Sequence, residues 1–283
     1  MSNRDEFISA SDYSRLRELI YEETGIALGS ERKTMLEVRI KRRLKELAVG
    51  SYAEYCGYVF SEDGRREELI HLIDVVTTNK TDFFREPRHF DFLASRALPA
   101  FFSAIANRRP MAVWSAGCST GEEPYTLAMV LSEFALVHPG FSFRILATDL
   151  STAVLKKAAL GIYSCEAVRP VPAALKVKYF MRGREVGSPR LRVVPELRRL
   201  IEFRRLNFMD AEYGLPGKAD AIFCRNVIIY FDRPTQQRIL ARLANCLTPE
   251  GFLFVGHAET LHDMNLPLVP VAPALYRRAG GHA

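Results

Sequence analysis

The stretch AVWSAGCSTGEEPY at residues 112–125 has the pattern of a buried strand, a tight turn and the beginning of a helix. A short apolar run leads into Gly117 and Gly121, which allow the backbone to turn sharply and to approach a ligand closely. Pro124 suits the first turn of a helix. In doubly wound α/β folds, ligands bind where such a turn joins the carboxyl end of a strand to a helix. The stretch therefore predicts a binding site for a nucleotide-type cofactor.

The residues of this turn distinguish between three kinds of cofactor. Gly117 and Gly121 stand four residues apart, which does not match the G-x-G-x-x-G pattern of a dinucleotide site. Glu122 and Glu123 come directly after Gly121, at the position where a phosphate-binding loop has a lysine, and their negative charges would repel a triphosphate. S-adenosylmethionine carries a cationic sulfonium and no phosphate, so a turn with a carboxylate suits it. The two glutamates also favour a helix start through the macrodipole, and that interpretation requires no ligand.

Composition narrows the class of protein. The 283 residues, 48% of them hydrophobic, allow one large or two modest domains with a substantial core. No apolar run approaches the roughly 20 residues that span a bilayer, and the first residues lack the apolar segment of a secretory signal. The five cysteines form no C-x-x-C pair and the histidines are scattered, so we expect a reducing cytoplasm and no metal site. The net charge of +6 predicts an acidic partner, which is a nucleic acid, an anionic membrane surface or an acidic protein.

Residues 11–76 have helical periodicity throughout and predict a small helical domain. On its second helix, five basic residues fall within seven positions opposite a leucine stripe: Arg39, Lys41, Arg42, Arg43 and Lys45. Arg39, Arg42 and Arg43 share one face at i, i+3 and i+4. Such a face is either a solvated surface or a docking surface for an acidic partner, and the clustering favours docking.

The segment NKTDFFR at 79–85 mixes amide, hydroxyl, aromatic and basic side chains, which is not typical of a helix. One interpretation is that Phe83 and Phe84 anchor a linker onto the second domain while Arg85 pairs with a surface carboxylate. The other is that the linker crosses the mouth of the cofactor site, with phenylalanine walls and with Arg85 presented to an anionic substrate.

Further apolar segments predict the strands of one sheet. FRILATD at 143–149 ends in Asp149, where this architecture places the acidic residue that binds ribose hydroxyls, although Asp149 would also suit as a helix cap. ADAIFCRNVIIYF at 219–231 is interrupted by Arg225 and Asn226 at the expected ligand end. With the later run GFLFVGH and the helices between these segments, the pattern predicts a largely parallel sheet. The segment at about 178–204 breaks the alternation and predicts an inserted, arginine-rich hairpin.

Four motifs in the same order resemble those of the CheR-type chemotaxis receptor methyltransferases, and the resemblance spans nearly the whole chain. The motifs are TTNKTDFFRE at 77–86, WSAGCSTGEEPY at 114–125, ATD at 147–149 and IFCRNVIIYFD at 222–232. The resemblance implies an α/β fold, with a Rossmann-like methyltransferase domain that carries an inserted small β-subdomain and follows an all-α domain. We expect the helical receptor-docking domain at 1–78, a linker that contributes to the cofactor site at 79–109, and the methyltransferase domain at 110–283 with its insertion at about 178–204.

The resemblance also implies a reaction and roles for residues. S-adenosylmethionine would be the cofactor and S-adenosylhomocysteine the product, with glutamate methyl esters formed on the cytoplasmic helices of methyl-accepting chemotaxis receptors. The residues expected to bind the cofactor are Asn79, Thr81, Arg85, Glu122, Asp149, Asn207, Phe208, Asn226 and Val227. Arg85 and Tyr230 are expected nearest to the transferred methyl group and the incoming carboxylate. The choice of Glu122 over Glu123 stays open.

The expected partners follow from the same resemblance. The face with Arg39, Arg42 and Arg43 would meet acidic receptor helices. In some members of the family the β-subdomain binds a peptide at the receptor's carboxyl terminus, and the loop at 184–189 leaves this open here. We expect a monomer in the cytoplasm, with no nucleic acid bound and no direct insertion into the membrane.

The reaction would need few catalytic groups. A glutamate with a pKa near 4.3 is already an anion at neutral pH, so no general base is required, and the sequence has no evident Ser/His/Asp or paired-carboxylate constellation. Two alternatives remain. A nucleic-acid methyltransferase commonly has Asn/Asp-Pro-Pro-aromatic where this chain has RNVI at 225–228, and the chain lacks an aromatic and basic stacking platform. The other alternative is a non-catalytic scaffold that senses S-adenosylmethionine.

Overall fold

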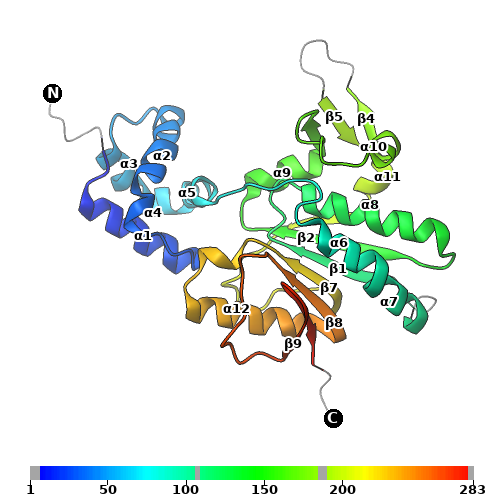
Figure 1. The fold of residues 1–283 in the computed structure, drawn as a ribbon. Helices are drawn as coiled ribbons and strands as arrows, with labels where there is room; N and C mark the ends of the chain where they lie inside the picture. Colours follow the sequence, from blue (N-terminus) through cyan, green and yellow to red (C-terminus); the bar gives the residue numbers. More distant parts are fainter. Residues whose placement is uncertain (1–6, 106–108, 184–189, 280–283) are drawn as a thin grey trace.

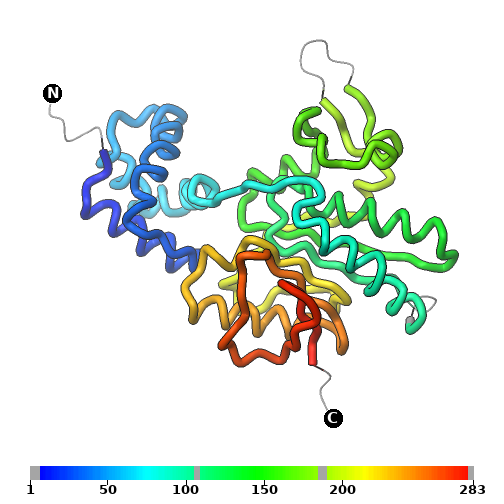
Figure 2. The backbone as a smooth tube through the Cα atoms, viewed as in Figure 1, coloured from blue at the N-terminus to red at the C-terminus, as the bar shows by residue number. Residues whose placement is uncertain are grey.

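The computed structural model describes residues 7–105, 109–183 and 190–279, which form a helical domain and an α/β domain (Figure 1). The backbone trace shows the chain passing from the first to the second through an extended segment that follows the last helix of the helical domain (Figure 2). In the described ranges, every helix is too short or too polar to cross a membrane.

The helical domain contains five α-helices among the described residues. They are α1 (Ala10–Thr24), α2 (Lys33–Leu47), α3 (Tyr52–Val59), α4 (Glu62–Glu67) and α5 (Leu69–Val76), with the 3-10 turn η1 (Ser30–Arg32) before α2. The leucine stripe of α2 is buried, with Leu36 and Ile40 fully enclosed. Helix α1 ends at Gly25, whose φ is 72°, and a Cβ there would lie 2.5 Å from Met209 Sδ. Glycine therefore lets the two domains approach closely at this point.

The α/β domain is built on a seven-stranded sheet with the order β6, β2, β1, β7, β8, β10, β9. The strands are β1 (Met111–Ala116), β2 (Phe143–Asp149), β6 (Ile201–Arg205), β7 (Ala219–Cys224), β8 (Leu247–Val255), β9 (Leu268–Ala272) and β10 (Leu275–Arg278). The first five strands in this order run parallel, as the alternation of strands and helices predicted, and β10 runs antiparallel to both of its neighbours, β8 and β9.

Helices cover both faces of this sheet. They are α6 (Pro87–Phe92), the π-helical turn η2 (Leu93–Ala97), α7 (Leu98–Ile105), α8 (Glu122–Val137), α9 (Thr152–Leu160) and α12 (Arg233–Cys246). Alternate strand residues belong to two cores. Val113 and Phe223 pack in the core that contains α6 to α8, whereas Trp114 and Ile222 pack in the core that contains α12 and the helical domain. The central strands are therefore buried on both sides, as parallel sheets require.

Two predicted boundaries in this domain were wrong. The small sheet consists of β3 (Ile162–Ser164), β5 (Arg190–Val193) and β4 (Phe180–Arg182), with α10 (Ala173–Tyr179) and α11 (Pro195–Arg198) beside it. It therefore begins before the predicted insertion at 178–204, and β6 at the end of that range belongs to the main sheet, because Ile201 pairs with Ile145 of β2. The loop at 184–189 lies outside the described residues.

The other difference concerns the predicted strand at 219–231. Strand β7 ends at Cys224, and the chain then turns through Asn226, whose φ is 58°, into the 3-10 turn η3 (Ile228–Tyr230). A left-handed residue cannot continue a strand, so the apolar residues after it form a turn at the edge of the sheet.

The turn after β7 contacts the helical domain. The Ala27 N–H donates to the carbonyl of Tyr230 at 2.9 Å, and Ile26 forms an isolated bridge with Phe231. The Tyr21 hydroxyl donates to Asp232 Oδ2 at 2.5 Å. The end of α1 and the segment after it are thus held against the carboxyl end of β7.

Candidate functional site

A cavity opens at the carboxyl ends of β1, β2 and β7, where the helical domain meets the α/β domain. With the open solvent at its mouth included, it encloses about 950 Å³. The residues of the predicted site that line it are Asn79, Thr81, Arg85, Asp149, Asn207, Phe208, Asn226, Val227 and Tyr230. The fold therefore brings together four segments that are distant in sequence, at the edge where parallel sheets bind ligands.

The glycine turn borders the cavity through Gly117 and Ser119. Gly117 has a φ of 89°, and a Cβ on it would lie 2.4 Å from a methyl carbon of Val227. The N–H groups of Gly117 and Cys118 donate to the carbonyl of Thr148 at 2.8 and 2.9 Å, which joins the ends of β1 and β2. Glycine is required here both by the backbone conformation and by the close approach of the turn after β7.

Asp149, at the end of β2, is held by two backbone N–H groups. Ser119 donates to Oδ2 at 2.8 Å and Ser151 donates to Oδ1 at 2.9 Å. Burial raises the pKa of Asp149, and these hydrogen bonds oppose the increase. The cap of α9 is the Ser151 hydroxyl, which accepts from the Val154 N–H, so the capping role considered for Asp149 was wrong. Its carboxylate instead connects β2 to the glycine turn beside the cavity.

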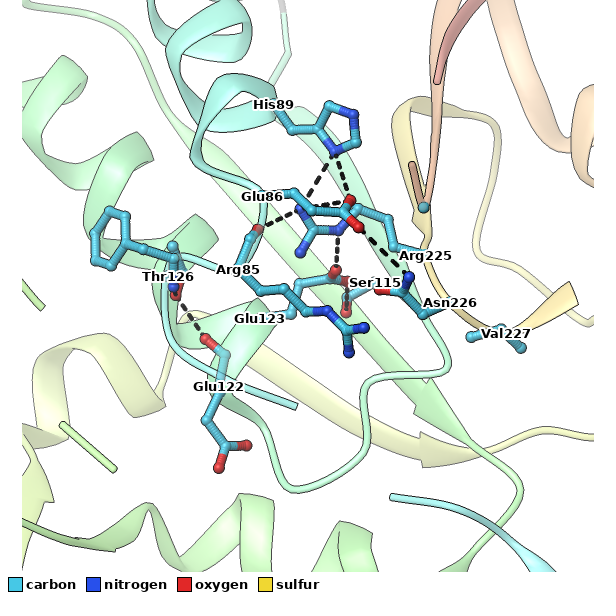
Figure 3. A network of polar contacts seen from close by, with 12 residues as sticks. Arg85, Glu86, His89, Ser115, Glu122, Glu123, Thr126, Arg225, Asn226 and Val227 are labelled. Atoms are coloured by element: carbon cyan, nitrogen blue, oxygen red, sulfur yellow. Dashed lines mark hydrogen bonds and ion pairs between the residues drawn. The ribbon is translucent and has the colours of Figure 1, made fainter. Parts of the chain in front are cut away.

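The two glutamates that begin α8 have different surroundings. Glu123 lines the cavity, and both of its oxygens have partners, since Ser115 Oγ donates to Oε1 at 2.7 Å and Arg225 Nε to Oε2 at 2.8 Å (Figure 3). Glu122 accepts from Thr120 Oγ1 at 2.7 Å and does not line the cavity. Burial raises the pKa of both carboxyl groups. Glu123 therefore stabilises the site internally, and a direct contact of Glu122 with the cofactor stays a prediction.

Arg225 accounts for the polar interruption in the predicted strand. Its side chain is only 2% exposed and ion-pairs with Glu123. Its Nη1 donates to the carbonyl of Arg85 at 2.7 Å and lies 3.3 Å from His89 Nδ1 (Figure 3). One buried guanidinium thus connects the linker, the start of α8 and the end of β7.

One part of the linker is anchored on the α/β domain, and another part borders the cavity. Phe83 is buried, with its ring centroid 4.9 Å from that of Tyr163 and 5.6 Å from that of Phe180, and it anchors the linker on the small sheet. Arg85 borders the cavity, and Asn79 is fixed there because its carbonyl accepts from Ser119 Oγ at 2.9 Å. The predicted phenylalanine walls were wrong, since neither Phe83 nor Phe84 lines the cavity.

Glu259 is a residue of the site that the sequence did not reveal. Its buried carboxylate accepts hydrogen bonds from five backbone N–H groups, those of Val227, Ile228 and Ile229 on Oε1 (2.8, 2.9 and 3.4 Å) and those of Asn226 and Gly256 on Oε2 (2.9 and 2.5 Å). Burial raises the pKa of Glu259, yet five donors require the ionised form, which is an acceptor only. In the sequence, Glu259 is visible only as an acidic residue shortly after a predicted strand. That position does not predict hydrogen bonds with backbone N–H groups about 30 residues earlier in the chain.

Two histidines that are far apart in sequence lie together beside the linker. His89 and His257 offer ligand atoms within 4.8 Å of one another and of Glu86. Arg225 Nη1 lies 3.3 Å from His89 Nδ1 and 3.9 Å from Glu86 Oε2. Burial and this guanidinium lower the pKa of His89 to about 4, so the ring is neutral at neutral pH. A divalent cation would be repelled by the fixed guanidinium, and we interpret the group as packing that positions Arg225.

The basic residues of α2 divide into two sets. Arg39 Nη1 donates to the carbonyls of Val75, Val76 and Thr77 at the end of α5, at 2.8 to 3.2 Å. Arg43 ion-pairs at 2.7 Å with Glu68, which is 1% exposed. The exposed basic side chains of the helix are Lys41, Arg42 and Lys45. Two of the three arginines predicted to dock a receptor therefore hold the helical domain together.

Comparison with known proteins assigns both domains to one family. Residues 11–77 match the family described as CheR methyltransferase, all-alpha domain, and residues 79–272 match CheR methyltransferase, SAM binding domain. The chain is 42% identical over 257 residues to chemotaxis protein methyltransferase 2 of Pseudomonas aeruginosa, covering 91% of this chain and 89% of the relative. It is 40% identical over 259 residues to the chemotaxis protein methyltransferase of Escherichia coli, covering 91% and 87%, and 38% identical over 275 residues to that of Borreliella burgdorferi, covering 96% and 95%. The chain belongs to the CheR methyltransferase family, whose α/β domain binds S-adenosylmethionine.

Proposed function

We propose that this enzyme methylates side-chain carboxylates of glutamates on the cytoplasmic helices of chemotaxis receptors. The names of the curated relatives support methylation in chemotaxis. One observation carries the choice of a carboxylate as acceptor. Among the described lining residues of the cavity there is no histidine, and its two carboxylates, those of Glu123 and Asp149, are already engaged in hydrogen bonds. A hydroxyl or amine acceptor would need a general base, whereas a glutamate is already ionised at neutral pH.

The lining residues fit the cofactor. Asp149 offers a carboxylate to the ribose hydroxyls, and Phe208 with Asn207 offers an apolar and a polar surface for the adenine. Asn79 and Arg85 lie on the linker side, where they would meet the methionine portion. When bound, S-adenosylmethionine supplies an electrophilic methyl carbon, whose bond to sulfur breaks as an acceptor oxygen bonds to it, and no proton is transferred. The protein then has to orient the acceptor and exclude water.

The exposed basic side chains of α2, Lys41, Arg42 and Lys45, support docking of acidic receptor helices on the helical domain. In this proposal residues 1–78 dock the receptor, 79–109 complete the cofactor site and 110–283 carry the chemistry, in a monomer. Binding of a receptor tail peptide by the small sheet stays a prediction, since the loop at 184–189 lies outside the described residues.

Replacing Tyr230 by phenylalanine should lower kcat about 10- to 100-fold while leaving the Kd of the cofactor unchanged. Tyr230 is half-buried and lines the cavity, where its hydroxyl would donate to the acceptor carboxylate, and a hydrogen bond to a charged group is worth about 1.5–3 kcal/mol. Steady-state kinetics and calorimetry with S-adenosylhomocysteine measure the two quantities. Tyr276→Phe in β10 is the control, and a normal kcat in Tyr230→Phe would remove this residue from the mechanism.

The proposal is tested by incubating the protein with methyl-labelled S-adenosylmethionine and cytoplasmic fragments of receptors, followed by mild alkali. A methyl ester releases its label as methanol, whereas an N-methyl group on a nucleic acid or a protein is retained. Alkali-labile label on receptor fragments that disappears when the acceptor glutamates are replaced by alanine is the expected result. Binding of the cofactor without transfer of its methyl group would favour a non-catalytic scaffold. Label on nucleic acid would favour a nucleic-acid methyltransferase.

A further inference from the structure

A cationic residue of the helical domain, Arg32, lines the cavity between the two domains. Arg32 is the last residue of η1, and its guanidinium carbon lies 5.4 Å from the centroid of the Tyr230 ring. Within the described ranges no carboxylate forms an ion pair with it. An arginine that stacks on an aromatic ring keeps the N–H groups at the edge of its plane available for a ligand.

The charged side chains that line the cavity have a net positive charge, which favours binding of an anion. Its described lining contains four cationic side chains, Arg32, Lys80, Arg85 and Arg225, and two anionic ones, Glu123 and Asp149. Arg225 and Glu123 neutralise each other at 2.8 Å, so three positive charges face one negative charge. S-adenosylmethionine carries two positive groups and one negative group, and its binding increases this surplus. A second ligand that brings a carboxylate would reduce it.

The backbone around Arg32 is fixed to the turn that follows β7. Ala27 donates to the carbonyl of Tyr230 at 2.9 Å, and Leu28 is buried. The carbonyl of Gly29 accepts from the Tyr13 hydroxyl at 2.7 Å, and the Arg32 N–H closes the turn onto the same carbonyl at 3.1 Å. The backbone that carries Arg32 is therefore fixed beside Tyr230, so a ligand bound there has to order only the Arg32 side chain.

We propose that Arg32 is a substrate-binding residue that recognises the carboxylate of the acceptor glutamate, so that the helical domain supplies part of the acceptor site. This inference rests on the proposed function. Arg32 and the Tyr230 hydroxyl together bind the acceptor from one side of the cavity, while the residues of the linker and the glycine turn bind the cofactor. Arg32 gives selectivity for an ionised acceptor over its amide, because a glutamate forms an ion pair with a guanidinium, whereas a glutamine accepts the same hydrogen bond without a negative charge.

The test compares two receptor peptides, one with glutamate and one with glutamine at the acceptor position, for binding to the full chain saturated with S-adenosylhomocysteine. The wild-type protein should bind the glutamate peptide about tenfold more tightly, the factor expected for a charge-assisted hydrogen bond. Arg32→Met should abolish this preference and leave the Kd of S-adenosylhomocysteine unchanged, and Arg32→Lys should restore part of the preference. Arg66→Met removes an exposed charge from the same domain and should retain the preference.

Two outcomes would overturn the assignment in different ways. If Arg32→Met keeps the preference for glutamate, or loses affinity for S-adenosylhomocysteine instead, Arg32 does not recognise the acceptor while the proposed function stands. If the wild-type protein shows no preference and no alkali-labile methylation of the glutamate peptide, the proposed function fails, and the role of Arg32 fails with it.

Discussion

Replacing Glu259 by glutamine should weaken binding of S-adenosylmethionine at least about tenfold and lower the free energy of unfolding by roughly 2–6 kcal/mol. The side chain accepts two backbone N–H groups on Oε2 and three on Oε1. A glutamine has one amide oxygen, so its NH₂ group must face at least two of these buried donors, and each unsatisfied donor costs about 1–3 kcal/mol. The turn that carries Asn226, Val227 and Tyr230 would then lose its position beside the cavity.

Calorimetric titration with S-adenosylhomocysteine and urea denaturation measure both effects. Glu250→Gln is the matched control, because Glu250 is an exposed carboxylate whose partner Arg277 is also exposed. The control should bind the cofactor normally. If Glu259→Gln also retained wild-type affinity and stability, the role of this carboxylate in holding the turn would be refuted.

The second large effect is expected from Arg225→Met, which should destabilise the protein by about 3–5 kcal/mol. The substitution leaves the carboxylate of Glu123 buried without its 2.8 Å ion pair and removes the donor to the carbonyl of Arg85. Burial already raises the pKa of Glu123, so removal of the guanidinium should raise it further and favour the protonated form. Urea denaturation at neutral pH measures the loss of stability.

A double-substitution cycle separates the charge from the packing. Glu123→Gln combined with Arg225→Met removes both charges, and it should recover part of the stability that Arg225→Met loses alone. Arg277→Met breaks an exposed pair and should cost less than about 1 kcal/mol. Independent, additive losses in the cycle would contradict a coupled buried pair.

Local sequence patterns predicted the central strands of the sheet and the glycine turn, because apolar runs and glycine spacing are properties of neighbouring residues. The apolar run before Gly117 forms β1, the run that ends in Asp149 forms β2, and their alternation with helices predicted a parallel sheet. The glycine turn lies at the cavity because strand direction determines where such turns meet. The motifs of the family then pointed to the other lining residues.

The parts that sequence reasoning missed depend on contacts between distant segments. Nothing near Glu259 in the sequence indicates that its acceptor lone pairs are used by residues 226–229. Periodicity placed Arg39 and Arg43 on one face of a helix, yet it did not show that α5 covers that face and supplies Glu68. Arg32 was missed because it lies far in sequence from the motifs of the α/β domain that line the same cavity.

Amide hydrogen exchange of the full chain, with and without S-adenosylhomocysteine, tests most directly whether the cofactor binds at the carboxyl ends of β1, β2 and β7. We expect slower exchange on binding in the linker at 79–85, the glycine turn at 117–121, the end of β2 at 149–151, the segment at 206–208 and the turn at 225–230. The result that would contradict it is binding with no change in these segments, or with slower exchange instead at the opposite ends of the strands, around Arg144, Arg199 and Lys218.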